Sequence, residues 1–202
     1  MKNAFAFLAF FLFTVHQMQA QDLVLLNRIK DTNGKTQCFE ADVANTMVKP
    51  KTTLTQEGKL YYVKPYEYAA LFTNGKYIIA NEKKIKMDIG MFHGTFKLRE
   101  GGMMQSISRI FLYGIQGRTQ DLADENGYAL TTQTEDDCHI ITATIIKKNF
   151  FGIGYKTVVF KYHTDSLLLK EIVLYDYNSV QDTYTISNIT CDVPIDKETF
   201  QF

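Results

Sequence analysis

The apolar residues of this chain fall into short runs that are separated by turn residues. Beyond residue 20 the runs are rich in β-branched and aromatic side chains, and pairs such as Asn74-Gly75 and Asn126-Gly127 stand between them. Runs of this length and composition are typical of antiparallel strands rather than of alternating strands and helices. We therefore expect a mainly β protein, a sandwich or a barrel, with strands over 59–63, 67–73, 77–81, 84–89, 128–134, 139–147, 156–163, 167–175 and 183–193.

Two segments break the strand pattern and predict helices. In 22–31, apolar residues recur every three positions and line one helical face. The other segment lies between Gly101-Gly102 and Gly117, and its apolar stripe leaves the side of Gln105, Ser108 and Arg109 polar. Such a helix is either a plug that fills one end of a barrel or a movable lid over it. The stripe residues are Leu23, Leu26 and Ile29 in the first helix, and Met103, Ile107, Ile110 and Phe111 in the candidate lid.

The segment 58–81 is apolar or amphipathic on both faces of its expected strands. Side chains alternate between the two faces of a strand, so every second residue shares a face. The wall of a barrel with an apolar cavity fits this pattern, and so does a two-layer sandwich with both faces packed. On the cavity interpretation, the lining residues are Leu60, Tyr62, Tyr68, Ala70, Phe72 and Ile78.

The first twenty residues have the organisation of a secretory signal peptide. They carry Lys2, an apolar core over 4–15 and a small-residue cleavage pattern that ends at Ala20. The core is shorter than the roughly 20 apolar residues that a membrane span needs. We expect cleavage after Ala20, export to an oxidising compartment, and a single domain over 21–202.

The charge balance restricts the classes of partner that this domain can bind, and the cysteine count restricts its disulfides. Removing Lys2 from the 22 basic residues leaves 21, against 22 acidic residues. A nearly neutral balance argues against nucleic acid or an anionic membrane surface as the main partner, because both call for a basic excess. Three cysteines, Cys38, Cys138 and Cys191, allow at most one internal disulfide, and the pairing stays open.

No group of residues in the sequence indicates catalysis, a metal or a cofactor. His93, His139 and His163 lack metal-ligand spacing, and the neighbours in 136–139 would point to opposite faces of a strand. The glycines at 152 and 154 fit a hairpin better than a dinucleotide loop, and no nucleophile elbow occurs. The acceptor motif at Asn188 falls within an expected strand. We expect a protein that is not an enzyme and needs no cofactor.

Short motifs along the chain resemble a known family in their order. Gly58-x-Leu60-Tyr61 is followed by Lys64-Pro65 and Asn74-Gly75-Lys76, and the chain closes on Ile195-Asp196 and Phe200-x-Phe202. This series is similar to the LolA family of periplasmic outer-membrane lipoprotein carriers. The family pattern reads Gly-x-Leu-aromatic, basic-Pro and Asp/Asn-Gly-Lys, then an aliphatic-Asp pair and Phe-x-Phe.

The resemblance implies an unclosed antiparallel β-barrel of the LolA/LolB kind, with a helical lid and an N-terminal helix. It also implies a monomeric periplasmic carrier that holds lipoprotein acyl chains in an apolar cavity. Such a carrier receives its cargo from an inner-membrane ATP-driven release complex and passes it to an outer-membrane acceptor. At the family's basic position, tied to lid closure and often arginine, this chain has Lys64.

The sequence alone is consistent with two other functions. One is a periplasmic binding protein or chaperone for another lipid or apolar small molecule. The other, from a different class, is a structural or adaptor protein that has the same fold and no cavity. The volume of the barrel interior separates the adaptor from the two binding proteins.

Overall fold

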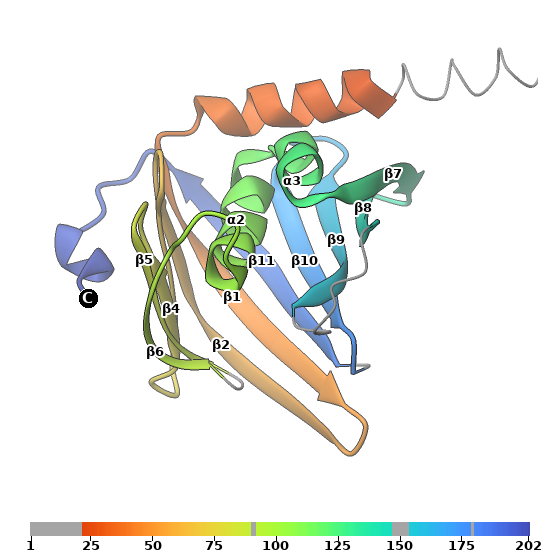
Figure 1. Ribbon diagram of the computed structural model, residues 1–202. Helices are drawn as coiled ribbons and strands as arrows, with labels where there is room; N and C mark the ends of the chain where they lie inside the picture. The colour runs from red at the N-terminus through yellow and green to blue at the C-terminus, as the bar shows by residue number, and fades with distance from the viewer. Residues whose placement is uncertain (1–21, 90–91, 147–153, 179) are drawn as a thin grey trace, which may run out of the picture.

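The computed structural model describes residues 22–89, 92–146, 154–178 and 180–202 (Figure 1). The expected signal peptide lies outside these residues, and so does most of the hairpin expected around Gly152. Within the described part of the chain, no helix is both long and apolar enough to cross a membrane. Cys38, Cys138 and Cys191 are free thiols.

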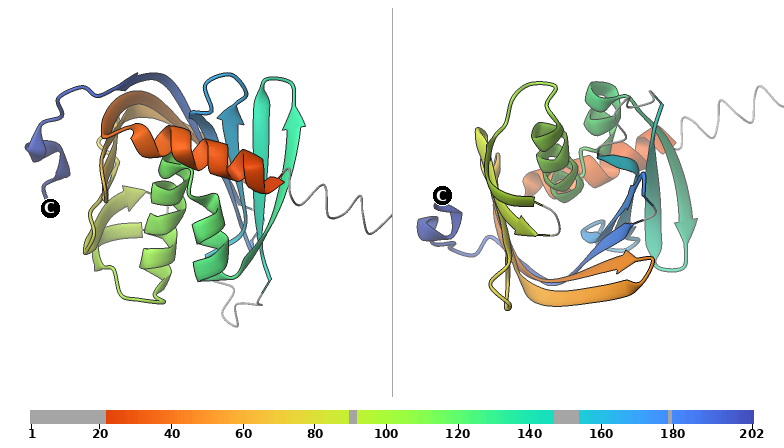
Figure 2. Two further views of the ribbon diagram at one scale, coloured as in Figure 1. Left: turned by 90° about the horizontal axis from the view of Figure 1, so that it is seen from above. Right: turned by 60° about the horizontal axis from the view of Figure 1, so that its bottom comes forward.

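Within the described residues, eleven antiparallel strands form one sheet, in the order β6-β5-β4-β3-β2-β1-β11-β10-β9-β8-β7. The sheet curls around a core without closing, and β6 and β7 are its two edges (Figures 1 and 2). This confirms the expected unclosed antiparallel barrel. The strands are β1 (Cys38–Lys49), β2 (Thr52–Val63), β3 (Glu67–Phe72), β4 (Tyr77–Ala80), β5 (Lys84–Ile89), β6 (Phe92–Lys97), β7 (Tyr128–Glu135), β8 (Cys138–Ile145), β9 (Tyr155–His163), β10 (Leu169–Asp176) and β11 (Gln181–Cys191).

The central strand β1 was not among the strands expected from the sequence. Its inward residues alternate strictly with outward ones, and Phe39, Ala41, Val43 and Asn45 are buried. Two of these four are small or polar, so β1 lacks the apolar run that marks its neighbours. Pairing with β2 and β11 on both sides decides its conformation.

Helix α2 (Met103–Gln116) packs against the concave face of the sheet (Figure 2). Gly114 allows the close approach, because a Cβ at this position would lie 2.7 Å from the ring of Phe160 in β9. The Tyr162 hydroxyl donates a hydrogen bond to the Gly114 carbonyl at 2.8 Å. Ser108 was expected to face away from the sheet, but it is buried and lies against Tyr68, whose hydroxyl is 3.4 Å from the Ser108 hydroxyl.

Helix α3 (Thr119–Asn126) was also missed by the sequence analysis, which expected only two helical segments. Its sequence is largely polar, and its buried apolar residues are Leu122 and Ala123. Residues 126–127 do not form a hairpin turn but the end of this helix. Gly127 has a φ of 71°, in the left-handed region, and its N–H donates to the Ala123 carbonyl.

The N-terminal helix spans 22–35 and crosses one end of the curled sheet (Figure 1). Leu26 and Ile29 of the predicted stripe are buried, while Leu23 is exposed. Asn33 fixes the helix by donating to the Ile29 and Leu167 carbonyls, each at 2.8 Å. The helix therefore closes the end of the barrel at which α2 finishes.

The convex face of β3 and β4 is covered by the C-terminal segment. The 3₁₀ helix η1 (Lys197–Phe200) brings Phe200 against Ala69 and Ile79, and all three are buried. The segment 58–81 is thus apolar on both faces because α2 packs on one of them and the chain end packs on the other.

Gly58 occupies a position where β2 and β3 approach too closely for a side chain. A Cβ there would lie 2.7 Å from the Phe72 Cα, in the backbone of the neighbouring strand. We expect Gly58→Ala to lower the free energy of unfolding by about 1–3 kcal/mol, as overpacking does. The control is Gly34→Ala in the N-terminal helix, where nothing lies within 4 Å. Urea unfolding of both variants measures the effect, and equal stabilities would contradict it.

Candidate functional site

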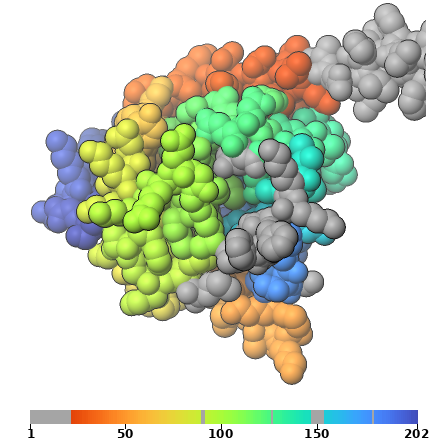
Figure 3. Space-filling view, viewed as in Figure 1, coloured from red at the N-terminus to blue at the C-terminus, as the bar shows by residue number. Residues whose placement is uncertain are grey.

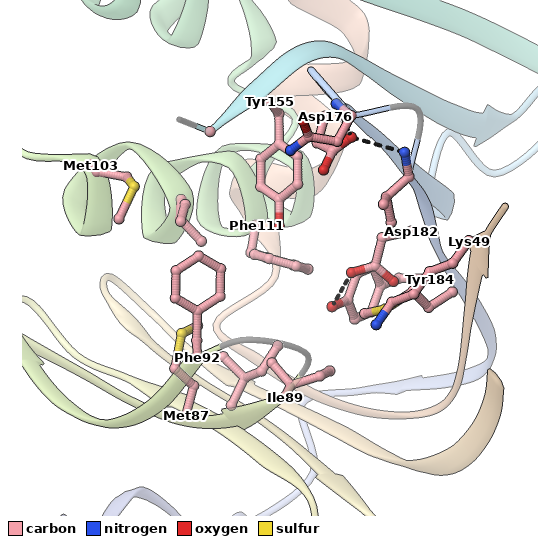
Figure 4. A pocket seen from close by; sticks show the side chains of 16 residues that line it. Lys49, Met87, Ile89, Phe92, Met103, Phe111, Tyr155, Asp176, Asp182 and Tyr184 are labelled. Atoms are coloured by element: carbon pink, nitrogen blue, oxygen red, sulfur yellow. Dashed lines mark hydrogen bonds between the residues drawn. The ribbon is translucent and has the colours of Figure 1, made fainter. Parts of the chain in front are cut away.

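A cavity of about 550 Å³ lies between α2 and the concave face of the sheet, at the end opposite the N-terminal helix (Figure 4). It is bounded by the start of α2 and by the ends of β1, β5 and β10. Its lining residues are Met47, Lys49, Ile78, Met87, Ile89, Phe92, Met103, Ile107, Phe111, Gly154, Tyr155, Asp176, Asn178, Val180, Asp182 and Tyr184.

One side of the cavity is apolar. Strands β4 and β5 contribute Ile78, Met87 and Ile89 from below, and α2 contributes Ile107 and Phe111 from above. All five side chains are at most 7% exposed, so they are held in place by the surrounding core. Methionine and isoleucine side chains offer an apolar surface with no fixed polar partner, which suits a hydrocarbon ligand.

The structure divides the predicted lining and lid residues between the cavity and the core. Ile78, Met103, Ile107 and Phe111 line the cavity, and Met103 lies at its mouth, 36% exposed. The others are buried where α2 packs directly on the sheet, because the approach at Gly114 leaves no comparable space there. These core residues are Leu60, Tyr62, Tyr68, Ala70, Phe72 and Ile110.

Lys64 lies where two helices meet the end of β2. Its ammonium donates to the Gly34 carbonyl at 2.7 Å, near the end of the N-terminal helix and not on α2. The next residue, Pro65, accepts a hydrogen bond at 2.7 Å from the side chain of Gln116, the last residue of α2. Lys64 and Pro65 together therefore join the N-terminal helix to α2 through the strand end.

The other side of the cavity is polar and includes a buried carboxyl. Asp182 of β11 is 6% exposed and accepts hydrogen bonds from the Asn45 amide and from the Tyr184 hydroxyl, the latter at 3.1 Å (Figure 4). Gln56 in turn donates to Asn45 at 2.9 Å. A line of polar side chains thus crosses the inner face of β2, β1 and β11 and ends at the cavity.

Burial raises the pKa of the Asp182 carboxyl above its ordinary value of 3.8. The hydrogen bonds from Asn45 and Tyr184 and the charge of Lys49 oppose this change only in part. No lysine, arginine or histidine nitrogen of the described residues lies within 4.0 Å of the carboxylate. An ionised Asp182 is therefore a buried charge without an adjacent counter-ion, which destabilises the fold.

A second hollow, of about 410 Å³, lies on the other side of α2 and is mostly polar. Both of its arginines are paired with carboxylates. Arg109 contacts Glu125 at 2.8 Å, and Arg118 contacts Asp121 and lies over the ring of Tyr113. The Arg109–Glu125 pair and the contact of Arg118 with Tyr113 hold α3 to α2, so the first cavity is the better candidate for a ligand.

The sequence analysis did not identify the polar end of the first cavity. Asp182 and Asn45 were not among the predicted site residues, and both lie outside the expected strands, the last of which covers 183–193. The alternation of residues along β11 could have predicted this polar end, because Asp182, Tyr184 and Ile186 share the inner face of the strand. No group of three or more potential metal ligands occurs among the described residues.

Several solved structures have a fold similar to that of this protein, whose surface is shown in Figure 3. An uncharacterized conserved protein from Thermus thermophilus superposes with a TM-score of 0.51 at 8% identity, over 91% of this chain and 94% of that one. MucB superposes with a TM-score of 0.50 at 10% identity, over 91% of this chain and 63% of the MucB chain. A LolA superfamily protein from Nitrosomonas europaea gives 0.44 at 9% identity, over 89% and 97% of the two chains.

The Thermus thermophilus protein and MucB therefore share the overall fold of this chain. At 8% and 10% identity, these two structures show the fold and nothing finer. No protein-family model and no curated protein sequence matches this chain.

The raised pKa of Asp182 predicts a pH-dependent stability. The folded state binds the proton more tightly than the unfolded state, so stability falls as pH rises from about 3.8 through the raised pKa. An amide resembles the neutral acid at every pH. We therefore expect Asp182→Asn to increase the free energy of unfolding by about 1 kcal/mol or more at pH 7. The gain should shrink as the pH is lowered toward 3.8.

Urea unfolding across this pH range measures the Asp182 effect. Asp42→Asn is the matched control, because Asp42 lies on the outer face of β1 and pairs with Lys59 at 2.9 Å. A loss of stability at pH 7 in Asp182→Asn alone would show that the carboxylate is needed by the fold.

Proposed function

We propose that this protein is a periplasmic carrier that binds the acyl chain of a lipid or lipoprotein and delivers it to the outer membrane. The observation that carries the proposal is the cavity of about 550 Å³ between α2 and the sheet, with apolar walls on one side and a polar end on the other. Each methylene that leaves water for such a wall contributes about 0.8 kcal/mol, so an acyl chain gains most from this site. On this account the protein binds rather than catalyses.

The size of the cavity favours a small cargo. Ligand pockets of about 300–1,000 Å³ bury one small molecule. The cavity as it stands therefore suits a single chain, and a lipoprotein anchor with several chains requires α2 to move outward. For this reason we keep a chaperone for a single-chain lipid as the second candidate function. In either case the export signal, an ATP-driven donor complex and an outer-membrane acceptor belong to the proposal.

The first turns of α2 are the part best suited to move. The helix begins at Gly102 without a side-chain cap and without an acidic residue in its first turn, so its N-terminal N–H groups are weakly stabilised. Residues 103–106 are partly exposed, with the cavity beneath Met103 and Ile107. The other end is fixed by Gly114 and by Gln116. Opening by the first turns would admit cargo while the second half stays packed.

A carboxylate on the apolar wall should abolish cargo binding. Ile107 lines the cavity at 3% exposure, and an unpaired charge there costs several kcal/mol against hydrocarbon. We expect Ile107→Asp to weaken uptake of a fluorescent fatty alcohol by about tenfold or more. Val24→Asp is the control, because Val24 is 60% exposed on the N-terminal helix. If folded Ile107→Asp, checked by circular dichroism, binds like the parent, then the cavity is not the binding site.

Replacing Lys64 tests whether the hydrogen bonds that connect the N-terminal helix to α2 through the end of β2 control release of the cargo. Lys64→Leu removes the hydrogen bond to Gly34, a loss of about 1 kcal/mol. We expect the bound probe to dissociate at a rate changed by about threefold to tenfold. Lys64→Arg keeps a charged donor and should release the probe as the parent does. Stopped-flow displacement measures the rate, and parent-like release by Lys64→Leu would leave the lysine without a part in gating.

A further inference from the structure

The polar end of the cavity has more acidic than basic groups, and the acidic groups are the more buried. Asp182 and Asp176 supply two carboxyl groups, and Lys49 supplies one ammonium. Asp182 is 6% exposed, Asp176 is half-buried, and Lys49 is exposed to solvent. Water screens the lysine more than the buried acids, so the field inside the cavity favours a positive group.

The hydrogen bonds of the two acids leave acceptor capacity toward the cavity. A carboxylate can accept about four hydrogen bonds. Asp182 accepts one on each oxygen, from Asn45 and from Tyr184. The Oδ1 atom of Asp176 accepts the N–H groups of Asn178 and Val180, at 2.7 Å and 2.8 Å. A ligand that brings hydrogen-bond donors can therefore use the remaining acceptor positions.

Aromatic rings complete the surroundings of the buried carboxyl. Phe111 of α2 meets the ring of Tyr184 edge to face at 4.8 Å. Tyr155 also lines the cavity, with its hydroxyl toward Phe111 (Figure 4). Tyrosine rings and a phenol oxygen both attract a cation.

We propose that this end of the cavity binds a primary ammonium group, so that the cargo is an amphiphile with an amine close to its acyl chain. The inference rests on the proposed function, because the chain must occupy the apolar side for the amine to reach Asp182. The ammonium supplies the counter-ion that Asp182 lacks and donates hydrogen bonds to acceptors around it. A fatty acid is disfavoured, since its carboxylate would lie beside Asp182.

Displacement of a neutral fluorescent probe by three twelve-carbon amphiphiles tests the proposal at pH 7. We expect dodecylamine to bind about tenfold more tightly than dodecanol, and laurate to bind more weakly than both. If dodecanol itself fails to bind, the proposed function fails with the inference. If dodecanol binds but the amine has no advantage over it, the ammonium site alone is overturned.

Substitutions then assign the preference to the carboxyl. Asp182→Asn should lose the advantage of dodecylamine over dodecanol while still binding dodecanol, and it is expected to fold because it removes a buried charge. Lys49→Met should increase the advantage of the amine, by removing a like charge. Asp42→Asn, on the outer face, should leave the advantage unchanged. An amine preference that survives in Asp182→Asn would overturn the assignment.

Two sources of such an amine can be separated with the parent protein. One is a lipid whose amine lies directly on its chain, represented by sphinganine, and the other is a lipidated amino terminus, represented by S-hexadecylcysteine methyl ester. Each is compared with its N-acetylated counterpart, which lacks the charge. Tighter binding of either amine than of its acetylated form supports the proposal and identifies the source. Equal binding within both pairs contradicts it.

Discussion

The architecture depends on a mismatch in length between the long strands of the concave sheet and the shorter helix α2 that covers it. Strands β1 and β2 have 12 residues each, about 40 Å of extended chain, whereas the 14 residues of α2 span about 21 Å. Because Gly114 draws the end of α2 into the sheet, the apolar face is filled near the N-terminal helix and left open at the far end. The cavity follows from this packing.

The same packing connects the two ends of the cavity. Phe111 is part of the apolar wall, yet it also packs on Tyr184, whose hydroxyl donates to Asp182. A ligand that changes the position of Phe111 would therefore also change the surroundings of the Asp182 carboxyl. A carboxylate retained at a cost in stability, where an apolar residue would pack, is the kind of local conflict expected at a functional site. The surface pairs around Arg109 and Arg118 show no such conflict.

Much of this arrangement could be predicted from periodicity. The helical spacing of Ile107 and Phe111 identified α2 and two residues of the cavity wall, and the apolar runs identified most strands. Asn45 and Ala41 concealed β1, because a central strand of small and polar residues is recognised only through its partners. The division of Leu60, Tyr68 and Ile78 between core and cavity depends on where α2 meets the sheet, a tertiary distance that no local pattern encodes.

The central claim is that the cavity between α2 and the sheet carries a single acyl amphiphile in the cell. Native mass spectrometry of protein purified without detergent from its own cells tests this most directly. The account predicts an added mass of one amphiphile in the parent and its absence from Ile107→Asp prepared in the same way. A parent protein that carries no ligand, or an Ile107→Asp variant that retains the same adduct, would contradict it.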